Sequence, residues 1–538
     1  MISYQKFSDF TAARTNMTSD CQRRHCDWRT QLLLMALVFA PGSASALTLG
    51  SLFQDHMVLQ QGVVVPVWGT AAPGATVRVA FAGQELGATA DREGRWRVDL
   101  QPLTANATSR SLRIETEGSQ RVINDVVVGE VWLCSGQSNM QMGVGSTDVR
   151  KIVAQVSRVR SFEVPRTVAY REQSECGGKW KTGPPTSAVA TAFAHFLQQR
   201  ADVPVGVVVA CWGSSSIEAW MPRDLSSELP HYAAQLEAMD ADTADRQRVE
   251  TILTGKRPWP RKEDIFLRRH PLLPYNAMVH PLVPYAMRGV VWYQGERNAQ
   301  ALRHRPQNPW MQQNAGMLEY DEAIEAWIKR LRRAWGRQEL QLLIVMLPGF
   351  GKTLSDGAEK SSTHPAALSW AWMRESQLKA AELSGVAVAN TIDLGLLNNI
   401  HPPDKLAIGQ RLARLAAREA LQQEVVAWGP VVSHTEPNRD TITVYFDHAE
   451  GLTTTDKKPP SGFWLADETG EWVPAEAVIQ GQTVMLQAER LANPQFVRYA
   501  FAGKPLVNLV NAAGLPAYPF RTDNFALITA SRRHVRPK

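Results

Sequence analysis

Five near-continuous apolar segments alternate with longer stretches of helical periodicity in the middle of this chain. An apolar run without polar alternation is typical of a strand buried on both faces, and helices between such strands make the strands parallel. The pattern therefore predicts an α/β domain over residues 126–427, with a parallel sheet covered by helices on both faces. The predicted strands are residues 127–134, 205–211, 289–293, 340–347 and 386–392, and the predicted helices include residues 188–200, 318–334 and 370–383.

Short segments of β pattern flank this region on both sides. In residues 47–125, runs of alternating character are separated by turns rich in Gly and Pro, and similar runs return over residues 428–538. Short strands with a turn about every eight to twelve residues indicate a small β-sandwich at each end. Within the α/β region, residues 222–274 are polar and charged, and we expect a partly helical insertion that caps the sheet.

The first 46 residues have the pattern of an export signal. Arginines precede an apolar core at residues 32–40, and Ala44-Ser45-Ala46 forms a small-x-small cleavage site. The apolar core is too short to span a bilayer stably. We expect cleavage after Ala46 and a periplasmic or secreted protein with no membrane anchor. The segment before the core is long for a signal, so Met17 is an alternative start.

Charge and cysteine content narrow the possible partners. The net charge of +6 is modest and its basic residues are scattered, which argues against nucleic acid binding. Signal cleavage leaves Cys134, Cys176 and Cys211, which allows at most one disulfide. Cys134 and Cys211 end apolar strands, and we expect both to be buried small hydrophobic residues. The sequence does not indicate an oligomeric state.

The first predicted strand ends in Gly136-Gln137-Ser138-Asn139. Such an ending places a hydroxyl at the carboxyl edge of a parallel sheet, where open α/β folds bind their ligands. Ser138 is therefore a candidate nucleophile, provided that a base and oxyanion donors lie at the same edge.

Three further segments that follow predicted strands supply such groups. Gly213 has no side chain to keep its N–H from a substrate oxygen, and Asn298 offers an amide. His401 follows the last strand and precedes a helix. Alone, each of these residues is more often a turn or structural residue. Their coincidence at one edge favours a hydrolase.

The candidate residues lie in four ordered segments: Gly-Gln-Ser-Asn-Met at 136–140, Trp-Gly-Ser at 212–214, Trp-Tyr-Gln-Gly-Glu-Arg-Asn at 292–298 and Ile-His-Pro-Pro-Asp-Lys at 400–405. Together these segments resemble the sialate O-acetylesterase family, within the SGNH hydrolases. Residues 53–61 and 511–517 are also similar to that family, so the resemblance covers nearly all of the mature chain. It implies a flavodoxin-like three-layer α/β/α core that deacetylates carbohydrates without a metal ion or other cofactor.

The resemblance also implies a role for each matching residue. Ser138 is the nucleophile, and its N–H, the N–H of Gly213 and the side-chain amide of Asn298 are the oxyanion donors. His401 is the general base, which then protonates the leaving sugar oxygen. Gln137, next to the nucleophile, is a further candidate site residue.

The third member of the triad departs from the usual pattern. Many SGNH hydrolases have an Asp two or three residues before the His, and this chain has Asn399 and Asn398 there. Asp393, at the end of the last strand, resembles the Asp of animal members and is the expected acid. A Ser–His pair oriented by Asn399 or by a backbone carbonyl is the alternative, and Glu296 is another candidate.

The expected partner is an acetylated carbohydrate, and 9-O-acetyl sialic acid is the first expectation. An acetylated plant polysaccharide such as xylan or xyloglucan is the enzymatic alternative. A carbohydrate-binding homologue without activity is the third reading, which the two β domains and the asparagines before His401 favour. A few of the 17 Trp residues could stack on sugar rings.

Overall fold

The computed structural model describes residues 46–300, 314–351, 364–366 and 369–526. One long strand, β8 (Ser119–Gly136), belongs to two parts of its sheet. Its first half pairs antiparallel with β7 (Asn106–Thr116), and its second half pairs parallel with β11 (Val205–Cys211) and β12 (Gly289–Tyr293). The expected boundary between residues 125 and 126 therefore falls inside one strand, where its partly exposed residues give way to fully buried ones.

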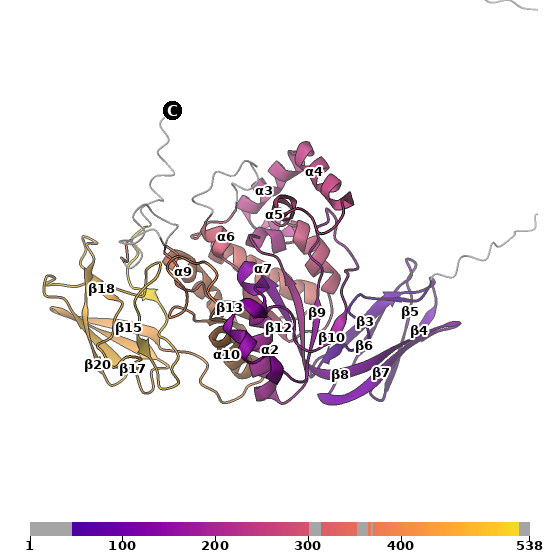
Figure 1. Cartoon of the computed structure of the whole chain (residues 1–538), viewed down its shortest axis with the longest axis horizontal. Helices are drawn as coiled ribbons and strands as arrows, with labels where there is room; N and C mark the ends of the chain where they lie inside the picture. Colours follow the sequence, from indigo (N-terminus) through magenta and orange to yellow (C-terminus); the bar gives the residue numbers. More distant parts are fainter. Residues whose placement is uncertain (1–45, 301–313, 352–363, 367–368, 527–538) are drawn as a thin grey trace, which may run out of the picture. The chain divides into compact units, whose positions relative to one another are not determined.

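The parallel part of the sheet has the order β9-β11-β8-β12-β13-β14, so the fold is α/β, as predicted (Figure 1). From β8 the chain adds strands first on one side and then on the other. Such a reversal brings loops apart beyond the carboxyl ends of the strands and creates a binding crevice there. All five predicted strands are present. The strands not yet given bounds are β9 (Val159–Glu163), β10 (Trp180–Thr182, antiparallel to β9), β13 (Gln341–Val345) and β14 (Val386–Ala389).

Helices cover both faces of this sheet. Trp132 of β8 packs edge-on against Phe193 of α2, with ring centroids 5.3 Å apart. On the other face, Trp292 of β12 packs on Trp327 of α7 at 4.3 Å. Helix α10 packs beside α2, and α9 beside α7. The bounds are α2 (Ala188–Ala201), α7 (Tyr320–Trp335), α9 (Ala371–Lys379) and α10 (Leu406–Leu415).

The polar stretch at residues 222–274 is largely helical, as expected. It contains α3 (Pro230–Ala241), α4 (Thr243–Thr254) and α5 (Arg261–Leu267). The N–H of Leu272 donates to the carbonyl of Glu218 at 2.8 Å, which joins this stretch to the segment that follows β11. The insertion is thereby attached at the carboxyl edge of the sheet.

Strands also flank the α/β part on both sides. Arg374 of α9 is fully buried and donates to the carbonyls of Leu347, Ala502 and Gly503, which ties the C-terminal strands to the α/β part. The N-terminal strands are β1 (Thr48–Leu49), β2 (Val58–Gln60), β3 (Val65–Thr70), β4 (Thr76–Phe81), β5 (Gln84–Thr89) and β6 (Arg95–Leu100). The C-terminal strands are β15 (Val431–Asn438), β16 (Thr441–Asp447), β17 (Thr453–Thr454), β18 (Phe463–Ala466), β19 (Val473–Pro474), β20 (Glu476–Gln480), β21 (Thr483–Gln487), β22 (Phe496–Tyr499), β23 (Leu509–Val510) and β24 (Phe520–Arg521).

Two further expectations concern cysteines and export. Cys134 and Cys211 are free and buried, as predicted. The expected signal at residues 1–46 lies, apart from Ala46, outside the described residues. Across the described chain, no helix has the length and apolar character needed to cross a bilayer.

Candidate active site

Ser138 lies at the carboxyl edge of the sheet, directly after β8. The strand ends at Gly136, whose φ of 137° lies in the left-handed region. A Cβ at Gly136 would stand 2.1 Å from the carbonyl oxygen of Tyr293, so only glycine fits there. Ser138 then begins the short helix α1 (Ser138–Gln141), and its backbone N–H has no partner within that helix. The hydroxyl is half-buried at the rim of the sheet.

His401 is brought to Ser138 from the loop between β14 and α10. Its Nε2 lies 2.8 Å from the Ser138 Oγ. Burial lowers the pKa of His401, and the nearby charge of Lys405 lowers it further. The imidazole is therefore neutral near pH 7 and can accept the hydroxyl proton. Among the described residues, the Nδ1 of His401 has no hydrogen-bond partner.

Among the described residues, Asp393, the expected triad acid, makes no hydrogen bond to His401. Both carboxylate oxygens of Asp393 accept from the guanidinium of Arg411, each at 2.7 Å. Arg411 is on α10, so this pair fastens the end of β14 to the following helix. Asn399 is closer to the base, and its Oδ1 accepts the backbone N–H of His401 at 2.9 Å.

Gly213 is packed directly against the nucleophile. A Cβ at this position would lie 3.1 Å from the Cβ of Ser138. The N–H of Gly213 donates to the side-chain carbonyl oxygen of Gln141 at 2.7 Å. The N–H of Gly213, which is the expected oxyanion donor, is therefore bonded to Gln141 in this structure. Gln141 was not identified from the sequence as a site residue, although it directly follows the Gly-Gln-Ser-Asn-Met segment.

Asn298, the other expected side-chain donor, makes no hydrogen bond to Ser138 in the described chain. It is fully buried, and its Nδ2 donates to the carboxylate of Glu218 and, at 3.0 Å, to the carbonyl of Ala315. Its Oδ1 accepts from Gln294, which also donates to Gln137 at 3.2 Å. The structure therefore places Asn298 and Gln137 in a supporting network below the site.

A second buried network lies behind the catalytic pair. The side-chain amide of Asn139 donates to Glu296 and, at 3.0 Å, to the carbonyl of Ile400, next to His401. Lys405 donates to the Asn139 Oδ1 at 2.7 Å. Burial raises the pKa of Glu296 to about 7 and lowers that of Lys405 to about 8. Asn139 and Lys405 lie in the segments 136–140 and 400–405, but the sequence did not indicate that their hydrogen bond joins these two segments.

A hollow of about 630 Å³ opens beside the loop that carries Gly213. Trp259 lines it and stacks on Trp212 at 6.4 Å between ring centroids. Asp264, also in the lining, accepts from the indole N–H of Trp212 at 3.2 Å. The hollow therefore borders the catalytic loop and offers an aromatic wall of the kind that sugars stack on.

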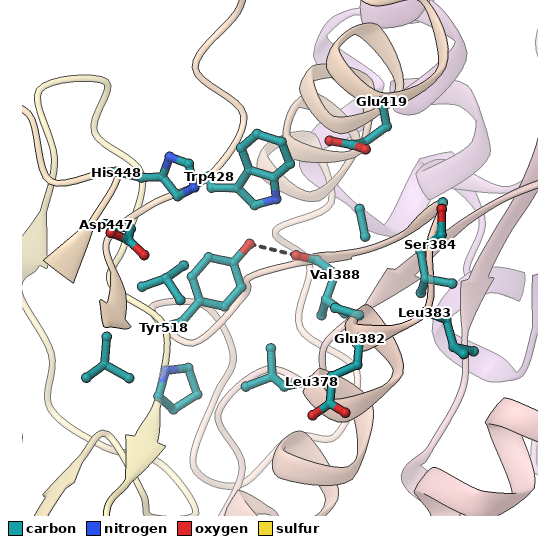
Figure 2. Close-up of a pocket in the computed structure, with 17 residues that line it drawn as sticks. Leu378, Glu382, Leu383, Ser384, Val388, Glu419, Trp428, Asp447, His448 and Tyr518 are labelled. Carbon is teal, nitrogen blue, oxygen red and sulfur yellow. Dashed lines mark hydrogen bonds between the residues drawn. The ribbon is translucent and has the colours of Figure 1, made fainter. Parts of the chain in front are cut away.

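Another cavity, of about 600 Å³, lies between the start of β14 and the C-terminal strands (Figure 2). Trp428, His448 and Tyr518 line one side of it, and Tyr518 donates to the carbonyl of Val388 at 2.7 Å. It surrounds the amino end of β14, whereas Ser138 and His401 lie beyond the carboxyl ends of the strands. This cavity is therefore separate from the catalytic pair.

The arrangement around Ser138 can perform acyl transfer. A hydroxyl in hydrogen-bond contact with a neutral imidazole can attack a carbonyl carbon while the imidazole takes its proton. The backbone N–H groups of Ser138, at the start of α1, and of Gly213, which packs against Ser138, are candidate donors to a bound carbonyl oxygen. The geometry thus contains a nucleophile, a base and donors for a developing negative charge.

The sequence relatives and a solved structure described below are named as acetylesterases. No protein-family model matches the chain. A sialate O-acetylesterase of Mus musculus is 27% identical over 523 residues, which is 88% of this chain and 93% of that protein. The same enzyme of Rattus norvegicus is 26% identical over 532 residues, with the same coverage. The crystal structure of a carbohydrate acetylesterase from Xanthomonas citri is 31% identical, with a TM-score of 0.73 over 89% of this chain and 100% of that chain.

Proposed function

Because this chain belongs to the sialate O-acetylesterase family and is an esterase of carbohydrate esters, we propose that it is an exported serine esterase. Its nucleophile is Ser138 and its base is His401. The observation that carries this proposal is the 2.8 Å contact between the His401 Nε2 and the Ser138 Oγ. The substrate is a sugar O-acetyl ester, and 9-O-acetyl sialic acid is the substrate we favour, since the rodent relatives are named for sialate esters.

The reaction proceeds in two acyl transfers. The Ser138 Oγ attacks the acetyl carbonyl carbon while the His401 Nε2 takes the hydroxyl proton. The tetrahedral intermediate collapses, His401 gives that proton to the leaving sugar oxygen, and an acetyl ester forms on Ser138. Water then attacks this ester, its proton passes to His401, and collapse releases acetate and the free hydroxyl of Ser138.

The negative charge on the acetyl oxygen is stabilised by the N–H groups of Ser138 and Gly213. Each donor contributes about 3–4 kcal/mol to transition-state stabilisation. Gln141 leaves the N–H of Gly213 when the ester enters. Asn298 keeps its contacts to Glu218 and Ala315 and supports the loop, so it is not the third donor.

We propose a catalytic pair rather than a triad. The bidentate contact of Asp393 with Arg411 supports a structural role for this carboxylate. Asn399 holds the backbone at His401, and Asn139 holds the preceding carbonyl. These contacts orient the imidazole through its backbone.

We also propose an SGNH-type core over residues 126–427 with β-sandwich domains at residues 47–125 and 428–538. The strand order and the antiparallel flanking strands support this division. Export is supported by the signal pattern in residues 1–46. The folded enzyme then acts in the periplasm or outside the cell.

The function is tested by acetate release from a panel of O-acetylated sugars. The panel contains 9-O-acetyl-N-acetylneuraminic acid, acetylated xylan and acetylated xyloglucan, assayed with the wild type and with Ser138→Ala. We expect release from the sialic acid by the wild type alone. Release only from the plant polysaccharides would change the substrate, and no release from any of them or from 4-nitrophenyl acetate would contradict an esterase.

A further inference from the structure

Arg297 is a buried charge that has no counter-ion among the residues that the structure describes. It lies in α6 (Glu296–Ala299), directly after the loop at the end of β12, and only 9% of its surface is exposed. Its backbone N–H donates to the Gln137 Oε1 at 3.1 Å. Its guanidinium makes no hydrogen bond or ion pair with any described residue. An unpaired charge is costly to bury, so a protein that retains one commonly uses it to bind an opposite charge.

A second guanidinium, that of Arg269, is also partly buried. Arg269 follows α5, and its buried Nε has no hydrogen-bond partner among the described residues. Its charge is near enough to lower the pKa of Arg297, which burial lowers most, to about 10. Both side chains remain charged at neutral pH. Because the two positive charges repel each other, binding of an anion beside Arg297 would relieve this repulsion.

The carboxylate of Glu218 does not neutralise this pair. Its charge raises the pKa of Arg297, but no ion pair within 4.0 Å joins the two residues. The Glu218 carboxylate is already held by the amide of Asn298 and by the N–H of Ala315 at 2.6 Å. The adjoining residues 301–313, which lie outside the described chain, contain no Asp or Glu in their sequence.

The backbone of Arg297 is held next to the segment that carries Ser138. Gln137, which accepts the N–H of Arg297, is the residue directly before Ser138. The neighbour of Arg269, Arg268, forms an ion pair of 3.0 Å with Asp264, which lines the hollow beside Trp212. An anion at Arg297 would therefore belong to a molecule whose other part reaches Ser138.

We infer that Arg297 and Arg269 form a subsite for the carboxylate of the acetylated sugar. The inference rests on the proposed function and deepens it, because it restricts the substrate to acidic sugars. A planar guanidinium donates two parallel hydrogen bonds to a carboxylate, a geometry that a neutral sugar hydroxyl cannot reproduce. Sialic acids and hexuronic acids share this carboxylate, and the position of the acetyl ester relative to it differs between them.

The test compares each acidic substrate with its neutral methyl ester. The substrates are O-acetylated N-acetylneuraminic acid and an O-acetylated hexuronic acid, each as free acid and as methyl ester. In the wild type, we expect kcat/KM for one free acid to exceed that for its methyl ester at least tenfold. In Arg297→Gln, that ratio falls at least tenfold, mainly through KM, and Arg297→Lys restores part of it. Arg269→Gln has a smaller effect in the same direction.

Arg261→Gln is the matched control, because Arg261 is an exposed arginine at the start of α5. We expect Arg261→Gln to keep the wild-type ratio of kcat/KM between the free acid and its methyl ester. The sugar whose free acid is hydrolysed at least tenfold better than its methyl ester identifies whether the bound carboxylate belongs to a sialic acid or to a hexuronic acid. Equal rates on acid and ester in the wild type would overturn the inference, as would an unchanged ratio in Arg297→Gln.

The melting temperature, measured with and without a free acidic sugar, tells whether Arg297 binds the carboxylate or only stabilises the fold, and it does so independently of catalysis. Free N-acetylneuraminic acid or the hexuronic acid raises the Tm of the wild type and of Ser138→Ala, whereas neutral N-acetylglucosamine does not. Arg297→Gln loses this shift but keeps or raises the unliganded Tm, because an unpaired buried charge is removed. A lower Tm with equal losses on both substrates would make Arg297 structural. Binding of the acid by a chain that hydrolyses no ester would sustain the subsite and refute the esterase.

Discussion

The His401 Nε2 lies 2.8 Å from the Ser138 Oγ, although 263 positions separate the two residues in the chain. The strands after which they lie are not adjacent, since β12 and β13 stand between β8 and β14. The loop before α10 must therefore reach back across the edge of the sheet. The contacts of Asn139 with Ile400 and Lys405 hold it there.

This pair predicts strongly non-additive effects of substitution. Ser138→Ala and His401→Gln each lower kcat by at least about 10³-fold, and the double variant is no slower than the slower single one, because the two groups act in one step. Single-turnover rates with 4-nitrophenyl acetate measure this. His434→Gln, at an exposed histidine, is the control. Losses that multiply in the double variant would mean that the two residues act independently.

Asp393→Asn is predicted to affect stability more than catalysis. It leaves Arg411, which is 9% exposed, without its carboxylate partner, and this costs about 1–3 kcal/mol because Asp393 itself is partly exposed. We expect kcat/KM to fall by less than about tenfold. Urea unfolding and steady-state kinetics check the two parts. A loss of about 10³-fold with unchanged stability would restore Asp393 as the triad acid.

The pH dependence of the rate reports the charge of His401. Only the neutral imidazole accepts the Ser138 proton, so kcat/KM rises with pH through the pKa of His401. Burial and the charge of Lys405 lower this pKa from its ordinary 6.5, so the midpoint of the acidic limb lies below pH 6.5. Lys405→Met removes a positive charge and moves the midpoint to higher pH. Lys179→Met, at an exposed lysine, leaves it in place; an unmoved midpoint in Lys405→Met would contradict this assignment.

In the proposed mechanism, Gln141 competes with the substrate for the N–H of Gly213. Its replacement by Ala removes an acceptor that the ester must displace, and a hydrogen bond of this kind contributes about 0.5–1.5 kcal/mol. We therefore expect kcat/KM to rise by about two- to tenfold in Gln141→Ala. Gln141→Glu holds the N–H more strongly and lowers it. A large loss in Gln141→Ala would instead show that the amide assists the reaction.

Much of the α/β fold could be predicted from the sequence. Buried parallel strands leave continuous apolar runs, and β11 and β12 match the predicted bounds. Strand β9 was missed because its sequence, Val-Arg-Ser-Phe-Glu, mixes charged and polar residues near the edge of the sheet. The predicted domain boundary at residue 125 is the point along β8 at which its residues become buried, and the strand itself continues through it.

The site was predictable where a residue follows directly from a strand end. Ser138, Gly213 and His401 come together because the carboxyl ends of parallel strands share one edge. The roles of Asp393 and Asn298 depend on partners that no local pattern reveals, Arg411 for the first and Glu218 for the second. The subsite at Arg297 is visible only once the absence of a partner among the described residues is known.

The central claim is that sugar acetyl groups pass through an ester on Ser138. The most direct measurement is rapid acid quenching of the enzyme with an O-acetylated sugar labelled in the acetyl group, followed by mass spectrometry of the peptide that contains Ser138. We predict labelled acetyl on Ser138 in the wild type, and neither label nor acetate release in Ser138→Ala. Acetate release by Ser138→Ala at the wild-type rate would contradict the account.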